Sequence, residues 1–197
     1  MKTIIISLKI FLFFTLLTGI LYPLIITGIA QVVFPEKANG SLIVKDNKII
    51  GSELIGQQFD TTIYFTSRPS AILYNPMPSG GSNYGLTNVK LKNLVADRKK
   101  QFIVFNQLDS LTVIPSEMLF ASASGLDPHI SQKAALLQVD RVAKARNFNA
   151  IQKQNLVQSV KNLTETRQFL VLGEERVNVL VLNLELNKLD QNFTNIK

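Results

Sequence analysis

Cysteine is absent from this chain of 197 residues, and histidine occurs only once. Without cysteine the protein can form neither disulfides nor thiolate metal sites. One histidine is too few for a structural zinc site, and no cluster of carboxylates lies near it in the sequence. We therefore expect no metal site and no tightly bound cofactor.

Acidic residues are fewer than basic ones: 14 Asp and Glu stand against 21 Lys and Arg, which gives a net charge of +7. The lysines and arginines are scattered and lack an interleaved aromatic platform, so we expect no nucleic-acid partner. A basic surface of this kind suits solvent, anionic lipid headgroups or acidic partner surfaces.

No complete nucleotide-binding motif is present. The segment SGGSNYG (79–85) superficially resembles a phosphate-binding loop, but it lacks the Gly-Lys-Ser/Thr ending that reaches the terminal phosphates. It is more typical of a flexible glycine-serine turn. A nucleotide-binding regulator that uses this loop is an alternative function. Its candidate residues are Ser79, Gly80, Gly81, Ser82 and Asn83.

The nucleophile motif G-x-S-x-G is also missing from the segment ASASGLDPHIS (121–131), which holds the only histidine. Asp127 before Pro128 instead predicts the start of a helix, with Ser131 as a competing cap. A membrane-anchored extracytoplasmic hydrolase that uses Ser122 or Ser124 with His129 is an alternative. We assign no catalytic residue and expect a protein that is not an enzyme.

What the chain does contain is one long apolar run. No charged residue occurs from Ile10 to Pro35, and as a helix this run is about 39 Å long, against a hydrocarbon core of about 30 Å. The apolar part of a cleaved signal peptide is usually shorter, at about 7–15 residues, so we expect a retained helix. A signal peptide cleaved near the small residues Gly28 and Ala30 is the alternative. Lys2 and Lys9 precede it, so the positive-inside rule places the N-terminus in the cytoplasm. We expect a short tail at 1–9, a helix across the inner membrane at 10–35 and an extracytoplasmic domain at 36–197.

Small residues recur every four positions in the apolar run and share one helix face, which another membrane helix could approach closely. These residues are Thr15, Gly19, Pro23 and Thr27. Pro23 also removes a backbone donor and predicts a kink. The alternative is the ordinary tolerance of membrane helices for glycine and proline.

The residue patterns of the soluble part predict an α+β fold that is helix-rich and has a small β-sheet. A hairpin is expected at 42–50, a strand at 61–65 and a long irregular region at 68–85. Helices are expected from Thr87, from Asp127 or Ser131, and from Asn149, while 177–182 fits a helix or a strand. Candidates for contacts with a partner are Arg68, Asp127, His129, Arg141 and Asn178.

Five blocks behind the single anchor together resemble the KdpC family, the C subunits of bacterial Kdp potassium-transporting ATPases. The blocks are YFTSRPSA (64–71), SGGSNYG (79–85), ASASGLDPHIS (121–131), QVDRVAKAR (138–146) and RVNVLVLNLELNKLD (176–190). The match runs over nearly the whole chain. One departure is Asp140, where a less acidic residue is expected.

The resemblance implies an accessory subunit that assembles and stabilises a larger complex in the lipid bilayer. The implied partners are a channel-like potassium-binding subunit, a P-type ATPase catalytic subunit and a small membrane peptide. The resemblance also implies that the chain raises the ATP affinity of the catalytic subunit, with ATP itself a possible ligand. Because the charge bias places the domain outside the cytoplasm, where ATP is scarce, we expect this role to be indirect.

Overall fold

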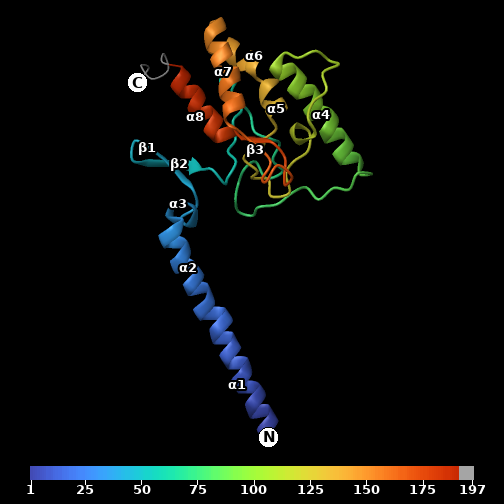
Figure 1. Ribbon diagram of the computed structural model, residues 1–197. Coiled ribbons are helices and arrows are strands. Elements are labelled where there is room, and N and C mark those ends of the chain that lie inside the picture. The colour runs from blue at the N-terminus through green and yellow to red at the C-terminus, as the bar shows by residue number, and fades with distance from the viewer. Residues whose placement is uncertain (191–197) are drawn as a thin grey trace. The chain divides into compact units, whose positions relative to one another are not determined.

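The computed structural model describes residues 1–190 (Figure 1). The chain forms two units, and the boundary between them in the sequence lies between Ser52 and Glu53. Residues 191–197, the end of the expected soluble domain, lie outside the described part. The expected fold class is confirmed: an N-terminal apolar helix precedes a helix-rich remainder with small sheets. The first unit extends beyond the apolar helix, because it also includes the hairpin that follows.

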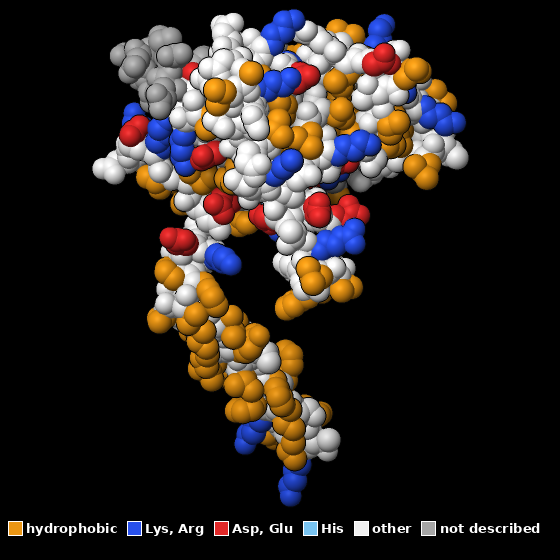
Figure 2. Space-filling model, turned by 45° about the horizontal axis from the view of Figure 1, so that its top comes forward, with side chains coloured by type: hydrophobic (Ala, Val, Ile, Leu, Met, Phe, Trp, Pro, Cys, Tyr) orange, Lys and Arg blue, Asp and Glu red, His pale blue; other side chains and the backbone are white. Residues whose placement is uncertain are grey.

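The first unit begins with a helix that runs without a break from Lys2 to Val33 and is long and apolar enough to cross a membrane. It consists of α1 (Lys2–Leu16), a π-helical segment η1 (Leu17–Leu21) and α2 (Tyr22–Val33). The π-helical segment ends just before Pro23, which lacks the N–H that a regular helix would need there. Figure 2 shows apolar side chains along this helix and Lys side chains at its N-terminal end.

A short helix, α3 (Pro35–Ala38), and a β-hairpin complete the first unit. Strands β1 (Leu42–Lys45) and β2 (Lys48–Ser52) pair antiparallel, with Lys45 opposite Lys48. Asp46 and Asn47 form the two-residue turn with φ of 50° and 59°. A type I′ hairpin turn requires positive φ at both of its central residues, and Asp and Asn tolerate this conformation. The predicted hairpin is therefore confirmed.

The second unit contains five helices among its described residues: α4 (Val89–Asn106), α5 (Gln132–Leu136), α6 (Val139–Ala145), α7 (Ala150–Asn162) and α8 (Val179–Leu189). A 3₁₀ turn, η2, covers Ser116–Met118. Strands β3 (His129–Ile130), β5 (Arg176–Asn178) and β4 (Thr164–Glu165) form an antiparallel sheet in that order. Helix α7 packs against both α6 and α8. The fully buried side chains of these helices include Val142, Leu156, Val160, Leu182 and Leu186.

The strand expected at 61–65 is wrong. This segment is irregular, and side chains rather than a neighbouring strand satisfy its backbone. Asn183 accepts a hydrogen bond from Phe65 N at 2.8 Å and donates one to Phe65 O at 2.9 Å. Gln138 accepts from Thr66 N at 2.7 Å. Since buried backbone groups need partners of some kind, these side chains take the place of a ladder.

The helix start expected at Asp127 is also wrong. Asp127 Oδ1 accepts a hydrogen bond from His129 N, and this bond closes a turn. The chain then enters β3. The competing cap, Ser131, starts the helix and accepts from Ala134 N at 3.1 Å. The helical stretch that follows is split into α5 and α6.

The remaining helix predictions are confirmed. Asn149 begins α7 with a capping box, in which its side chain accepts from Gln152 N and Gln152 accepts from Asn149 N. The ambiguous stretch 177–182 contains both structures. It starts in β5 and turns into α8 at Asn178, whose side chain caps the helix.

Candidate functional site

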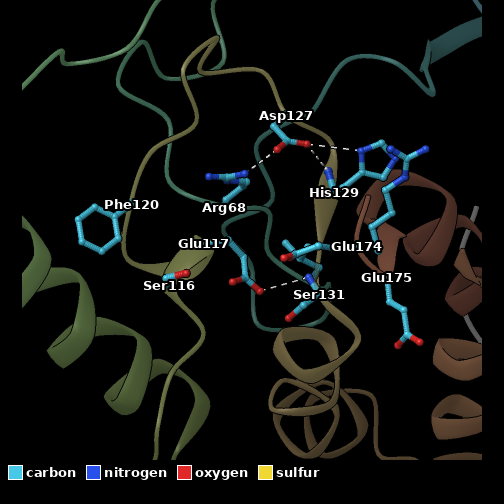
Figure 3. A pocket seen from close by; sticks show the side chains of 11 residues that line it. Arg68, Ser116, Glu117, Phe120, Asp127, His129, Ser131, Glu174 and Glu175 are labelled. Carbon is cyan, nitrogen blue, oxygen red and sulfur yellow. Dashed lines mark hydrogen bonds and ion pairs between the residues drawn. The ribbon is translucent and has the colours of Figure 1, made fainter. Parts of the chain in front are cut away.

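A pocket of ≈ 530 Å³ opens on the second unit (Figure 3). Arg68, Asp127 and His129 meet at one part of its wall, and Figure 3 shows Asp127 joined to both neighbours. Two arginines and four carboxylates line the pocket, so its charge is opposite in sign to that of the whole chain. The charged lining residues are Arg68, Glu117, Asp127, Glu174, Glu175 and Arg176.

Arg68 is positioned by a tight turn that follows it. The Ser70 hydroxyl accepts hydrogen bonds from Ile72 N at 3.2 Å and from Tyr74 N at 3.0 Å. The Tyr74 hydroxyl in turn donates to Arg68 O. Burial raises the pKa of Tyr74 to about 12, so this phenol stays protonated and able to donate. The turn therefore fixes the backbone from which the Arg68 side chain projects.

Asp127 and His129 are positioned by the sheet and by a close backbone approach. His129 lies opposite Asn178 in the β3–β5 pair, and Val179 N donates to Pro128 O at 2.9 Å. Gly56 N donates to Leu126 O at 2.7 Å, and a Cβ at Gly56 would lie 2.8 Å from Asp127 O. Only glycine allows the two chain segments to approach this closely.

Both oxygens of the Asp127 carboxylate are engaged. Oδ2 accepts from Arg68 Nη1 at 2.6 Å, and Oδ1 lies 3.0 Å from His129 N and 3.4 Å from His129 Nδ1. Burial alone would raise the pKa of this carboxyl, but the hydrogen bonds from His129 and the charge of Arg68 outweigh it and lower the pKa to about 2. Asp127 is therefore ionised and already fully bonded, so it is unsuited to take up a proton.

The three side chains are only partly exposed: 21% for Arg68, 29% for Asp127 and 23% for His129. Arg68 Nε is buried and has no hydrogen-bond partner among the described residues. Because His129 Nδ1 faces Asp127, its Nε2 is left for solvent or a partner. The arrangement can present a fixed, charged recess to another molecule.

A hydrolytic triad needs a hydroxyl within reach of the histidine. In residues 1–190, neither Ser122 nor Ser124 forms a hydrogen bond with His129. The Ser124 hydroxyl instead accepts from Leu126 N at 3.1 Å, and Ser122 is buried. Ser131 lines the pocket, but its hydroxyl caps α5.

Arg141 lies in the core and not in the pocket. It is 3% exposed, and its guanidinium donates to Asn106 Oδ1, Gln138 Oε1 and the carbonyls of Thr62 and Tyr64, at 2.6–2.9 Å. Burial lowers its pKa to about 10, so it is still charged at neutral pH. Arg141 therefore holds the irregular 61–65 segment in place.

Arg141 belongs to a larger network of polar side chains that the sequence reasoning did not predict. We call it the arginine network, and its members are Gln138, Arg141, Arg146, Asn183, Asn187 and Asp190. Arg146 donates to Ile63 O at 2.8 Å and Asn187 Oδ1 at 2.9 Å, and pairs with Asp190 Oδ2 at 3.2 Å. The signal available in the sequence was polar residues on otherwise apolar helix faces. Such residues are buried only when they find partners.

Asn178 also has an internal role. Its Oδ1 accepts from Leu180 N and Val181 N at the start of α8, and its Nδ2 donates to Glu53 O at 2.8 Å. The side chain is 8% exposed. These bonds join the start of the second unit to the strand beside the pocket.

The loop at 79–83 packs against the segment that holds Ser122 and Ser124. Gly80 N donates to Ser124 O at 3.1 Å, and a Cβ at Gly81 would lie 3.2 Å from Ala123 O. A phosphate-binding loop needs its backbone N–H groups free to point at the ligand. The Gly80 N–H is used internally here, and ATP binding by the 79–83 loop stays a prediction.

The four small residues of the apolar helix lie on both sides of the π-helical segment or within it. Thr15 donates its hydroxyl to Phe11 O at 2.8 Å, which satisfies it inside the helix. Gly19 lies within η1 and has open space around it. Pro23 and Thr27 follow in α2. The helix is exposed along its whole length, which leaves these residues accessible to a partner helix or to lipid.

Three or more histidines and carboxylates do not come together in a metal-binding arrangement anywhere in residues 1–190.

The family model described as "K+-transporting ATPase, c chain" matches residues 4–188. A relative from Geotalea uraniireducens, named potassium-transporting ATPase KdpC subunit, is 48% identical over 195 residues, which cover 97% of this chain and all of the relative. A KdpC subunit from Geobacter metallireducens is 48% identical over 90% of this chain and 93% of its own length. One from Leptospira interrogans is 46% identical over 92% of each chain.

Proposed function

Because this chain belongs to the KdpC family of potassium-transporting ATPase subunits, we propose that it is a non-catalytic subunit that assembles and stabilises the complex and raises the ATP affinity of the ATP-hydrolysing subunit. The family match over residues 4–188 carries this proposal. The proposed partners are a channel-like potassium-binding subunit, a P-type ATPase subunit and a small membrane peptide. The chain itself is a single-pass membrane protein.

The structure supports an assembly role in two ways. The helix Lys2–Val33 has no buried side chain, so its apolar faces are free to contact another membrane helix. In the second unit, the pocket presents fixed charges whose internal partners hold them in place. Rigid charged groups of this kind favour specific docking, because little side-chain freedom is lost on binding.

We propose that the second unit lies outside the cytoplasm, on the far side of the inner membrane from the ATP. Its influence on ATP affinity is then a coupling between two distant sites. The subunit would contact the nucleotide-bound state of the pump better than the empty state, and so shift the population toward it. Such coupling is reciprocal: ATP must tighten the binding of this chain by the same factor.

The test compares the purified complex with and without this chain. We expect the chain to co-purify with the larger membrane subunits, and the complex without it to bind a non-hydrolysable ATP analogue with a higher Kd. Binding of the chain to the other subunits should tighten by an equal factor when a non-hydrolysable ATP analogue is added. A chain that purifies alone, or that tightens without any change in ATP affinity, would contradict the proposal.

The orientation can be tested separately because the chain has no cysteine. In Leu111→Cys, the only thiol lies at a residue that is 88% exposed in the second unit. A thiol reagent that does not cross the inner membrane should label it in intact cells. The matched control, Thr3→Cys at the start of the helix, should react only after lysis. The reverse pattern would place the second unit in the cytoplasm.

A further inference from the structure

The loop between β4 and β5 carries a run of large apolar residues that the second unit does not bury. Phe169, Leu170, Val171 and Leu172 are 87%, 85%, 76% and 58% exposed. We call these four residues the apolar tip. A polypeptide that folds in water normally buries such residues, and a contiguous exposed group of them marks a contact site.

The apolar tip has a defined backbone. Gln168 and Leu172 form a β-bridge, with Leu172 N donating to Gln168 O and Gln168 N to Leu172 O, each at 2.8 Å. Phe169 and Leu170 have positive φ of 52° and 64°, an unfavourable conformation for bulky residues. The loop holds its apolar side chains on the outside of this turn.

Charged residues begin immediately on either side. Arg167 precedes the loop, and Glu174, Glu175 and Arg176 follow Gly173. Arg176 pairs with Glu165 at 2.9 Å across the β4–β5 pair. An apolar end with a charged base is the pattern of a segment that enters a membrane surface only as far as its charges allow.

The tether keeps the second unit close to a bilayer. The membrane helix ends at Val33 and the second unit begins at Glu53, and part of the chain between them is folded into α3 and the β1–β2 hairpin. Fully extended, such a linker would span about 60 Å, and the folded elements shorten it. A unit of this size has a radius of gyration of only about 14 Å. The bilayer is thus an apolar phase that stays within reach of the tip.

We propose that the apolar tip inserts into the headgroup and upper acyl region of the bilayer that holds the chain's own anchor. The insertion gives the second unit a second, non-covalent attachment and so limits its orientations. The two arginines and two glutamates that flank the tip balance in charge, so they give no net preference for anionic lipid. Burial of apolar side chains therefore drives the insertion, and a zwitterionic bilayer is sufficient.

The absence of tryptophan allows a direct test. Phe169→Trp supplies a single fluorophore at the tip, and Leu111→Trp supplies one at an equally exposed apolar position elsewhere in the second unit. Each full-length variant is placed in phosphatidylcholine nanodiscs with and without brominated acyl chains. We expect brominated lipid to quench Phe169→Trp about twofold or more, with a blue-shifted emission, and to leave Leu111→Trp unquenched.

Aqueous iodide should give the opposite order, quenching Leu111→Trp more strongly. Adding Leu170→Glu to Phe169→Trp should abolish the quenching by lipid, because it puts a charge into the tip. Iodide quenching of Phe169→Trp equal to that of Leu111→Trp would overturn the proposal. Shielding of Phe169→Trp from both quenchers, only when the other subunits are present, would also overturn it, since the tip would then contact protein.

Discussion

Two arginines of the second unit form opposite kinds of site. Arg141 is 3% exposed and gives its donors to neutral oxygens, several of them backbone carbonyls. The Arg68 side chain is 21% exposed and gives one donor to a carboxylate, with its buried Nε unpaired among the described residues. The buried arginine stabilises a segment of chain, whereas the partly exposed one shapes a pocket with capacity for a further contact.

The buried network and the pocket also differ in how they draw on the five blocks that carry the family resemblance. Three of its five blocks, 64–71, 138–146 and 176–190, contribute groups to the arginine network or to the backbone that the network holds. Their spacing is thus a signature of how the core is built. The five blocks supply Arg68, Asp127, His129, Ile130, Ser131 and Arg176 to the pocket, whereas its other lining residues lie outside them. Membership of the family consequently predicts the fold more firmly than it predicts the contacts.

The largest expected effect is at the buried arginine. Arg141→Met removes the donors for Asn106, Gln138 and two backbone carbonyls. The buried Asn106 Oδ1 loses this donor, while Gln138 Oε1 keeps its bonds from Thr66. Leaving a buried acceptor without its partner typically costs about 1–3 kcal/mol, and several bonds are lost here at once. We expect urea unfolding of the full chain in detergent, followed by tyrosine fluorescence, to show a loss of this size.

The matched control is Lys144→Met on the same helix, α6. Lys144 is exposed and donates only to Gln107 Oε1 at 2.8 Å. Surface substitutions of this kind usually change stability by less than about 0.5 kcal/mol. Equal effects of the two substitutions would show that Arg141 does not hold the 61–65 segment.

A smaller, pH-dependent effect is expected at the pocket. The pKa of Asp127 is lowered to about 2 from its usual 3.8, so its carboxylate stabilises the folded state above about pH 4 and loses this contribution as the pH falls toward 2. At pH 7, Asp127→Asn should cost on the order of 1–2 kcal/mol, since the pair is partly screened by solvent.

The check is the difference in unfolding free energy between the unsubstituted chain and Asp127→Asn, measured at pH 7 and near pH 2. This difference should shrink at the acid pH, where the carboxyl becomes protonated in the folded state as well. A difference that stays constant would mean that Asp127 contributes through shape and not through its charge.

Much of the architecture could be predicted from the sequence because local signals decide it. Asp46-Asn47 dictated the hairpin, Asn149 the start of α7, and the apolar run the membrane helix. The strand expected at 61–65 is not formed. Its β-branched and aromatic composition indicates a buried extended segment, but it does not determine which groups hydrogen-bond to the backbone. The partners, Gln138 and Asn183, lie more than 70 residues away.

The pocket was predictable only in part. Arg68, Asp127 and His129 were chosen as partner candidates, and the structure brings them together, although 59 residues separate the first two. Arg141 and Asn178 were chosen by the same reasoning and lie in internal hydrogen-bond networks instead. No local property of the sequence separates the two groups, since burial depends on how distant helices pack.

The smallest effect is expected at Asp140, the residue that departs from the family pattern. It directly precedes Arg141, yet its side chain is 75% exposed and pairs with Lys153 on α7 at 2.8 Å. Adjacent helix positions face different directions, so Asp140 can point to solvent while Arg141 points inward.

An exposed ion pair contributes about 0–1 kcal/mol, and salt weakens it further. Asp140→Asn should therefore shift the urea midpoint barely at low salt and not at all at high salt, whereas the loss in Arg141→Met should be nearly independent of salt. A salt-insensitive loss at Asp140 as large as that at Arg141 would mean that the acidic residue acts on the arginine network, and the contrast between exposed and buried charges would fail on this helix.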